Sequence, residues 1–165
     1  MKVMHKRLLE VLAYEPITGV FRWRVKIAKN TLVGSIAGTM NDIGYRQIRI
    51  DGTIYCEHQL AWFYMTERWA ERLDHKNRIR SDNRLENLRE ATHSQNLHNT
   101  KAPKNNTSGM KGVSKSKRKR NPFCARICVN ERHINLGNFP TKEEAYQAYV
   151  QASQKYLGEF ACELP

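Results

Sequence analysis

The segment from Arg72 to Thr100 concentrates the side chains that can do chemistry, because His, Asn, Asp and Arg replace most of its apolar residues. Within it, Asp74 and His75 are adjacent. A carboxylate is a hard oxygen ligand of the kind that Mg²⁺ or Mn²⁺ prefers, and an imidazole can accept a proton near neutral pH. Hydrolysis of a phosphodiester bond uses both groups, since water must lose a proton while a cation stabilises charge on the phosphate. The pair therefore indicates metal-assisted hydrolysis.

The residues that follow the Asp-His pair make its functional interpretation more specific. Alone, Asp74 could cap a turn and His75 could be an ordinary exposed loop residue. An Asp-Asn-Arg-Leu-Glu-Asn-Leu-Arg run then begins at Asp82, and a Gln-Asn pair ends at Asn96. A pattern of this length is far more specific than any single pair.

The same residues resemble the HNH nuclease family, and specifically its phage-encoded and intron-encoded homing endonucleases. In that family a two-stranded ribbon and one helix, the ββα-metal core, grip a single metal ion. The resemblance implies that Asp74 and Asn96 are the metal ligands and that His75 is the general base. It also implies that Asn87 fixes the tautomer of the imidazole through a hydrogen bond. Many members carry His in place of Asn96, and the amide oxygen here favours Mg²⁺ over Zn²⁺.

Several polar residues near this pattern have two interpretations. Asn83 is expected to brace the loop through hydrogen bonds to the backbone. His58 opens the preceding helix where the HNH family also carries a His, or it is only a helix-start residue that packs beside the site. His93 and His98 are expected to face solvent or phosphate rather than to bind the metal.

Two arginines stand on either side of Asn87. Arg84 and Arg89 could hold the scissile phosphate, or they could brace Glu86 and Glu90 at the surface. For Arg84 the phosphate contact is the preferred interpretation.

Short strands are expected to precede the site. Alternating residues predict strands over 20–25, 45–50 and 53–56, with Asp51-Gly52 as a tight hairpin turn between the last two. The strand over 45–50 should place Ile48 and Ile50 on one face and Arg49 on the other. A helix over 58–65 follows, and its core-facing stripe is predicted to be Leu60, Ala61, Tyr64 and Met65.

A second module is predicted beyond the site. Residues 101–109 have the composition of a flexible linker. Three strands should follow, over 112–116, 123–129 and 132–136, with a turn at 130–131. A helix is expected to begin after Thr141, which forms a capping box with Glu144, and to end at Gly158. It should cover one face of the sheet with Ala145, Ala148, Tyr149, Ala152 and Tyr156.

The open face of that sheet is a candidate surface for DNA. The span from Lys111 to Arg132 is strongly basic and contains a single acid, Glu131. A three-stranded sheet backed by one helix can place its free face in the major groove. The residues predicted to bind DNA are Arg84 and, in the second module, Lys111, Lys115, Lys117, Arg118, Arg120, Arg126, His133 and Asn135.

The second module also resembles a known family. Gly112-Val113, the strand from Phe123 to Ile127, Leu136-Gly137-Asn138-Phe139, the helix start from Thr141 to Ala145, and Gly158 carry a likeness to the AP2/ERF DNA-binding domain. That domain is also found fused to phage HNH nucleases. The resemblance implies a DNA-reading function, although Ser114, Lys115 and Asn135 stand where the family often shows aromatic or Arg side chains.

Composition supports a nucleic-acid partner. A formal net charge of +12 and a pI near 9.8 point to a polyanion. A membrane is excluded as a partner, because no run approaches 18 apolar residues and the N-terminus has no apolar leader. The four cysteines contain no C-x-x-C pair, so reduced thiols and no structural zinc are expected.

These observations predict an α+β protein with N-terminal antiparallel strands, a ββα-metal nuclease core and a three-stranded antiparallel sheet on one helix. The expected domains are residues 1–100, with the nuclease core over about 54–100, and residues 110–165. Residues 101–109 would join them.

The expected function is hydrolysis of duplex DNA by an HNH homing-type endonuclease that needs one divalent metal ion. Mg²⁺ is expected, and Mn²⁺ is the alternative. A DNA-binding regulator with an inactive HNH fold is a different possibility, and charge alone does not distinguish RNA from DNA. The protein should act as a monomer or homodimer without an obligate protein partner, in the cytoplasm, which would be that of a bacterial host if it is phage-encoded.

Overall fold

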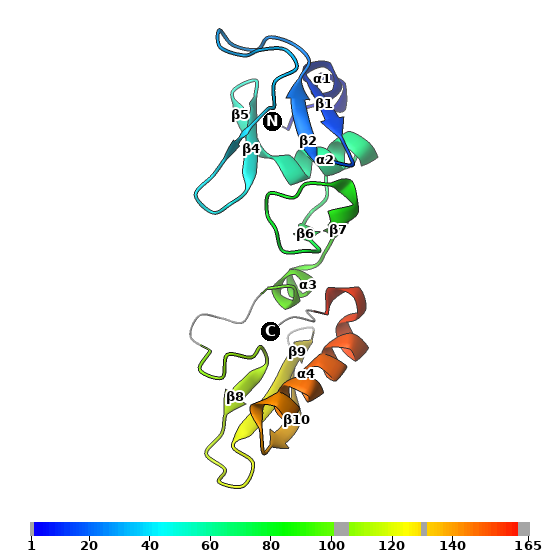
Figure 1. Ribbon diagram of the computed structural model, residues 1–165. Coiled ribbons are helices and arrows are strands. Elements are labelled where there is room, and N and C mark those ends of the chain that lie inside the picture. Colours follow the sequence, from blue (N-terminus) through cyan, green and yellow to red (C-terminus); the bar gives the residue numbers. More distant parts are fainter. Residues whose placement is uncertain (1, 101–105, 130–131, 162–165) are drawn as a thin grey trace. The chain divides into compact units, whose positions relative to one another are not determined.

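The computed structural model describes residues 2–100, 106–129 and 132–161, and its mixture of helices and antiparallel strands agrees with the α+β class (Figure 1). The chain forms two compact units, Met1–Glu90 and Ala91–Pro165. We expected the division at the linker over 101–109, whereas the structure divides at Glu90. Residues 101–105 of that linker lie outside the described part of the chain.

The first unit is built from small antiparallel sheets around a helix. The sheets are β1–β2, β3–β4–β5 and β6–β7. The elements in chain order are α1 (His5–Val11), β1 (Leu12–Glu15), β2 (Val20–Trp23), β3 (Thr39–Met40), β4 (Arg46–Ile50), β5 (Thr53–Cys56), α2 (Glu57–Thr66), β6 (Leu73–His75), the 3-10 turn η1 (Leu85–Asn87) and β7 (Leu88–Glu90).

The hairpin between β4 and β5 confirms the turn predicted at Asp51-Gly52. Ile50 pairs with Thr53, and the two turn residues have φ values of 47° and 82°. Positive φ at both central positions is the geometry of a tight hairpin turn whose twist matches that of the strands. Ile48 and Ile50 are buried and Arg49 is exposed, as the alternation predicted.

Helix α2 confirms most of its predicted stripe. Leu60 and Ala61 are fully buried, and Phe63, which the stripe omitted, is also buried. Met65 is 45% exposed, so its predicted place in the core was wrong. The reason is its position at the edge of the stripe, one residue before the helix ends at Thr66.

One apolar core joins the N-terminal elements to the strand that follows the site. Leu88 of β7 belongs to the same buried cluster as residues of α1, β1, β2, β4 and α2. The β6–β7 ribbon is therefore anchored by packing rather than by its own few strand hydrogen bonds. The principal members of this core are Leu8, Leu12, Phe21, Ile48, Leu60 and Leu88.

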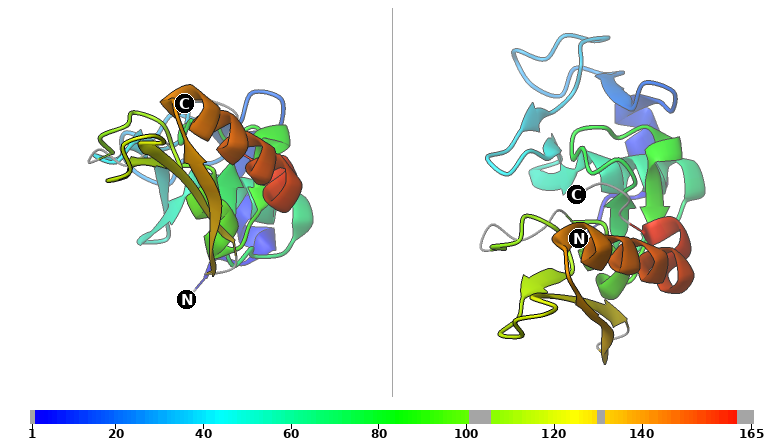
Figure 2. Two further views of the ribbon diagram at one scale, coloured as in Figure 1. Left: turned by 90° about the horizontal axis from the view of Figure 1, so that it is seen from below. Right: turned by 60° about the horizontal axis from the view of Figure 1, so that its bottom comes forward.

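The second unit is a sheet with a helix across one face (Figure 2). Its antiparallel strands have the order β10–β9–β8. The elements are α3 (His93–His98), β8 (Val113–Lys115), β9 (Phe123–Val129), β10 (Arg132–Phe139), α4 (Lys142–Leu157) and the 3-10 turn η2 (Gly158–Phe160). The turn predicted at 130–131 lies outside the described residues.

Helix α4 begins as predicted, because the Thr141 side chain accepts a hydrogen bond from the Glu144 backbone amide at 3.2 Å. Ala145, Tyr149 and Ala152 are buried against the sheet. Tyr156 is 43% exposed, so its predicted burial was wrong; it lies in the last turn, near the end of the helix at Leu157.

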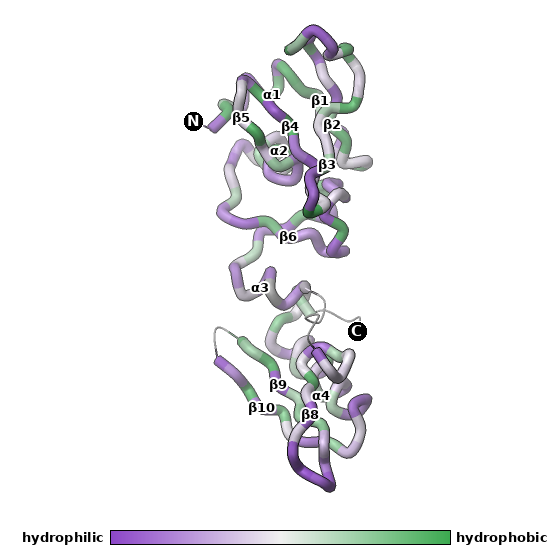
Figure 3. The backbone as a smooth tube through the Cα atoms, turned by 90° about the vertical axis from the view of Figure 1, so that its left-hand side faces the viewer, coloured by the Kyte–Doolittle hydropathy of each residue, from purple (hydrophilic) through white to green (hydrophobic). Residues whose placement is uncertain are grey.

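The described residues contain no helix that is long and apolar enough to cross a membrane. Figure 3 shows instead that hydrophilic segments are frequent along the chain, including the loop between β8 and β9. Cys56, Cys124 and Cys128 are free thiols, as expected, and Cys162 lies outside the described part.

The turn between β1 and β2 packs closely on the backbone of the loop before η1. A Cβ atom at Gly19 would lie 2.5 Å from the Arg84 backbone nitrogen and 2.6 Å from the Asn83 carbonyl carbon. Gly19 also has φ +72°, where an L side chain is strained. Only a glycine lets the two segments approach this closely.

Replacing Gly19 with Ala is expected to destabilise the first unit by about 2 to 3 kcal/mol, because backbone strain and steric overlap add. Gly52→Ala is the matched control, since Gly52 has φ +82° but open space around it, and should cost about 1 kcal/mol. Urea unfolding can be followed by tryptophan fluorescence, because Trp23, Trp62 and Trp69 all lie in the first unit. Equal losses would contradict the close approach.

Candidate active site

The β6–β7 ribbon carries the adjacent Asp74 and His75. Its antiparallel register pairs Asp74 with Arg89 and His75 with Leu88. Both site residues are nearly inaccessible to solvent, at 8% and 6% exposure respectively. Buried polar side chains require hydrogen-bond partners, so the contacts of these two residues define what the site can do.

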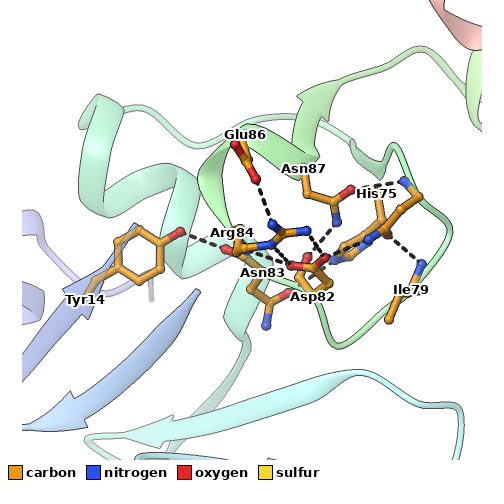
Figure 4. Close-up of polar contacts among 9 residues, drawn as sticks. Tyr14, His75, Ile79, Asp82, Asn83, Arg84, Glu86 and Asn87 are labelled. Atoms are coloured by element: carbon orange, nitrogen blue, oxygen red, sulfur yellow. Dashed lines mark hydrogen bonds and ion pairs between the residues drawn. The ribbon is translucent and has the colours of Figure 1, made fainter. Parts of the chain in front are cut away.

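Asn83 contacts the imidazole of His75. The Asn83 Oδ1 atom lies 3.1 Å from His75 Nε2, and the Asn83 side chain is 1% exposed (Figure 4). On its other side, Asn83 Nδ2 donates to Glu57 Oε2 at 3.2 Å. The Asn83 backbone is also fixed, because the Tyr14 hydroxyl donates to its carbonyl oxygen at 2.7 Å. Asn83 is thus the residue that orients His75, and not merely a brace for the loop.

Asn87 does not make the hydrogen bond to His75 that the sequence predicted. Its Oδ1 accepts from the Asn77 backbone amide at 3.0 Å, and its Nδ2 donates to the Asp82 carbonyl at 2.7 Å (Figure 4). Asn87 therefore braces the loop over 77–82, so the predicted roles of Asn83 and Asn87 are exchanged. Both residues are Asn in the same loop, and nothing in their spacing shows which amide faces the imidazole.

A buried ion pair supports Asn83. Glu57, at the start of α2, is fully buried, and both of its carboxylate oxygens accept from Arg46 Nε at 3.0 Å. Arg46 also donates to the Ala37 carbonyl at 2.7 Å. Burial raises the pKa of Glu57, while Arg46 and Asn83 act in the opposite direction. The sequence analysis missed both residues, because a Glu at a helix start has the ordinary role of stabilising the helix dipole.

The imidazole of His75 is favoured in its neutral form. Burial lowers the pKa of His75, and this exceeds the opposite effects of Asn83, Asp74 and Asp82. A neutral imidazole keeps one nitrogen able to accept a proton at neutral pH. The local structure therefore suits a general base.

His58 lies beside His75, which agrees with both of its interpretations. The two rings meet edge to face with centroids 5.1 Å apart. Burial, with a smaller contribution from His75, lowers the pKa of His58 to about 4. Its Nδ1 atom is buried and has no hydrogen-bond partner among the residues that the structure describes.

Asp74 is held by an arginine. Arg89 donates to Asp74 Oδ2 from Nε at 2.9 Å and from a terminal nitrogen at 2.8 Å. The two side chains are 9% and 11% exposed, so water screens the pair only weakly. Arg89 thus fixes the expected metal ligand rather than bracing Glu90 at the surface. Asn96 lies on α3 in the second unit, so ligation by Asp74 and Asn96 together stays a prediction.

Comparison with known protein families decides the nature of this segment. A family model described as HNH endonuclease matches residues 55–98. These residues form an HNH endonuclease domain. The match extends from the end of β5 to α3 and contains Asp74, His75, Asn87 and Asn96. No curated protein matches the chain closely enough to name a relative. The HNH resemblance is confirmed, whereas the homing-endonuclease type and the AP2/ERF likeness stay predictions.

Arg84 of the HNH domain is engaged by acids. It donates to both oxygens of Asp82 at 2.9 and 2.8 Å, and to Glu86 at 2.8 Å (Figure 4). The hydrogen bonds from Arg84 lower the pKa of Asp82 to about 2. Two carboxylates thus engage the guanidinium group, and the phosphate contact preferred for Arg84 stays a prediction.

The burial of His98, on helix α3, also differs from expectation, and Lys111 contacts the end of the same helix. His98 is 8% exposed and therefore does not face solvent. Burial lowers the pKa of His98, and the charge of Lys111 lowers it further, while a hydrogen bond with the Cys128 backbone has the opposite effect. Lys111 Nζ donates to the carbonyls of His98 and Thr100 at 2.5 and 2.6 Å. Lys111 therefore caps the end of α3, and its predicted contact with DNA stays a prediction. His93 is exposed, as predicted.

The remaining candidates for DNA binding are exposed. The register pairs Arg126 with Asn135 and Cys128 with His133, so Arg126, His133 and Asn135 share one face of the sheet. A cavity of about 400 Å³ in the second unit is lined partly by Arg126, His133, His93 and Lys111. The basic residues at the end of β8 and in the following loop are exposed too: Lys115, Lys117, Arg118 and Arg120.

Replacing Asp82 with Asn should reduce stability by about 1 kcal/mol at neutral pH, where the paired carboxylate is ionised. The folded-state pKa near 2 lies below the unfolded value of about 3.9, so this contribution is present above pH ~4 and is lost as pH falls towards 2. Urea unfolding at a series of pH values measures the difference from wild type. The exposed Asp42→Asn is the control, and a difference that persists at pH ~2 would contradict the pairing.

Proposed function

We propose that the protein is a metal-dependent endonuclease of the homing type that hydrolyses phosphodiester bonds in duplex DNA. The observation that carries this proposal is the buried His75, oriented by Asn83 within a segment that matches HNH endonucleases. The basic character of the chain fits a DNA substrate.

His75 is the proposed general base. It would accept a proton from the water that attacks the phosphorus atom, and its neutral form makes that transfer feasible near neutral pH. Asn83 keeps the ring in one orientation throughout the transfer. Asn87 contributes indirectly, because its side chain holds the loop over 77–82 against the ribbon.

Asp74 and Asn96 are the proposed ligands of one divalent ion, Mg²⁺ by preference and Mn²⁺ as an alternative. The donor set fits such an ion, since a carboxylate and an amide supply hard oxygen atoms. When bound, the ion would stabilise charge on the phosphate and on the leaving oxygen. Arg89 keeps Asp74 oriented and supplies a positive charge beside it.

The second unit is the proposed DNA-reading module, with an AP2/ERF-like use of its sheet. Arg126, His133 and Asn135 would reach base edges from the shared face. Lys115, Lys117, Arg118 and Arg120 would bind phosphates and set the register without reading sequence.

A DNA-binding regulator with an inactive HNH fold is the second candidate. One observation favours it: Arg89 donates two hydrogen bonds to Asp74, the proposed metal ligand. In that function the second unit would bind DNA and the HNH domain would not cut it.

His75→Ala is expected to lower cleavage of supercoiled plasmid by at least about 100-fold, because the general base is lost. Binding to DNA in EDTA should change little, since the basic residues remain. Gel electrophoresis with Mg²⁺, Mn²⁺ or EDTA follows the nicked and linear products. Cleavage that survives the substitution would remove His75 from its role, and wild-type protein that binds without cutting would favour the regulator.

Arg126→Gln is expected to weaken binding to a specific duplex by about tenfold or more, because a base-edge contact from the sheet face is lost. Lys142→Gln is the matched control, since it also removes one exposed charge but lies on α4, across the opposite face. Fluorescence anisotropy at fixed salt concentration measures both. Equal effects of the two variants would show that charge alone, rather than the sheet face, binds DNA.

A further inference from the structure

The His75 imidazole belongs to a continuous chain of buried and partly buried polar contacts. Arg46 of β4 contacts Glu57 of α2, Glu57 contacts Asn83, and Asn83 contacts His75. The first two members lie outside the loop that carries the Asp-His pattern. A chain of this kind transmits orientation, because each side chain has a fixed set of donors and acceptors.

The Glu57 carboxylate fixes the orientation of the Asn83 amide. An ionised carboxylate only accepts hydrogen bonds, so the Asn83 atom that faces it must be the nitrogen. The amide oxygen then has to face His75 Nε2, which lies 3.1 Å away. Without the carboxylate, the same amide could turn over and present its nitrogen to the imidazole.

The orientation of the amide determines which imidazole nitrogen carries the proton. An amide oxygen accepts but cannot donate, so Nε2 of a neutral His75 has to be the N–H donor. The lone pair that can take a proton then resides on Nδ1. We propose that Glu57 and Arg46 are positioning residues that select the Nε2–H tautomer of His75 by fixing the Asn83 amide.

The surroundings hold Glu57 in place for this role. Arg46 contacts both carboxylate oxygens and is itself tied to the Ala37 carbonyl. A Cβ atom at Gly38 would overlap with Glu57 Oε1, so the chain over 37–38 closes tightly over the carboxylate. An uncompensated buried charge would be costly, and the pair with Arg46 is what keeps it in the core.

Glu57→Gln is the decisive substitution, because it preserves shape but gives the side chain both a donor and an acceptor. Glutamine can then satisfy either orientation of Asn83, and the selection of one tautomer is lost. Glu71→Gln is the control, since Glu71 is exposed and carries the same chemical change.

Long-range ¹H–¹⁵N correlation spectra of full-length protein report the imidazole tautomer directly, at a pH where His75 is neutral. The His75 signals are assigned by their absence from the His75→Ala spectrum. We expect the Nε2–H tautomer in wild type and in Glu71→Gln, and a mixture with the Nδ1–H tautomer in Glu57→Gln. A wild-type spectrum dominated by Nδ1–H, or an unchanged spectrum of folded Glu57→Gln, would overturn the proposal.

The significance for catalysis rests on the proposed function, but the tautomer measurement requires neither metal, DNA nor cleavage. If Glu57→Gln does not fold, the wild-type spectrum still tests the selection, because it has to be dominated by the Nε2–H tautomer. In the cleavage assay, Glu57→Gln should lower the rate about tenfold or more with unchanged DNA binding. An inactive wild type with the expected tautomer would overturn the nuclease proposal alone.

Discussion

The buried carboxylate of Glu57 imposes the strongest physical constraint on the first unit. A charge with no exposure to water has to be matched, and Arg46 and Asn83 provide the match. Arg46 stands on β4, Glu57 begins α2, and Asn83 precedes η1, so one ion pair and one amide join three parts of the chain. The orientation of His75 is therefore set by elements that contain none of the proposed metal ligands.

The N-terminal strands therefore support the HNH domain through direct contacts. Tyr14 holds the Asn83 carbonyl, Gly19 lets the β1–β2 turn lie against the same loop, and Leu88 ties β7 into the common core. The family match begins at residue 55, yet Arg46 and these N-terminal contacts precede it. A site that acts by positioning needs such rigid support, because small displacements of a general base lower its efficiency.

Sequence patterns predicted the elements better than they predicted the contacts between polar side chains. The Asp51-Gly52 hairpin, the buried Ile48 and the Thr141 cap follow from local rules of twist, alternation and capping. The exchange of roles between Asn83 and Asn87 depends on how the loop folds over the ribbon, which no local rule specifies. The burial of Glu57 and His98 was missed for a related reason: both side chains find partners on other elements, Arg46 on β4 and the Cys128 backbone on β9.

The central claim is that His75 activates water for attack on a DNA phosphate. Cleavage of a pool of randomised duplexes in oxygen-18 water, followed by mass spectrometry of the cut ends, tests it most directly. The account predicts that wild-type protein with Mg²⁺ places one oxygen-18 atom in each new terminal phosphate, and that His75→Ala yields at least about 100-fold fewer labelled ends in the same time. Cut ends without the label, or an equal yield of labelled ends from His75→Ala, would contradict it.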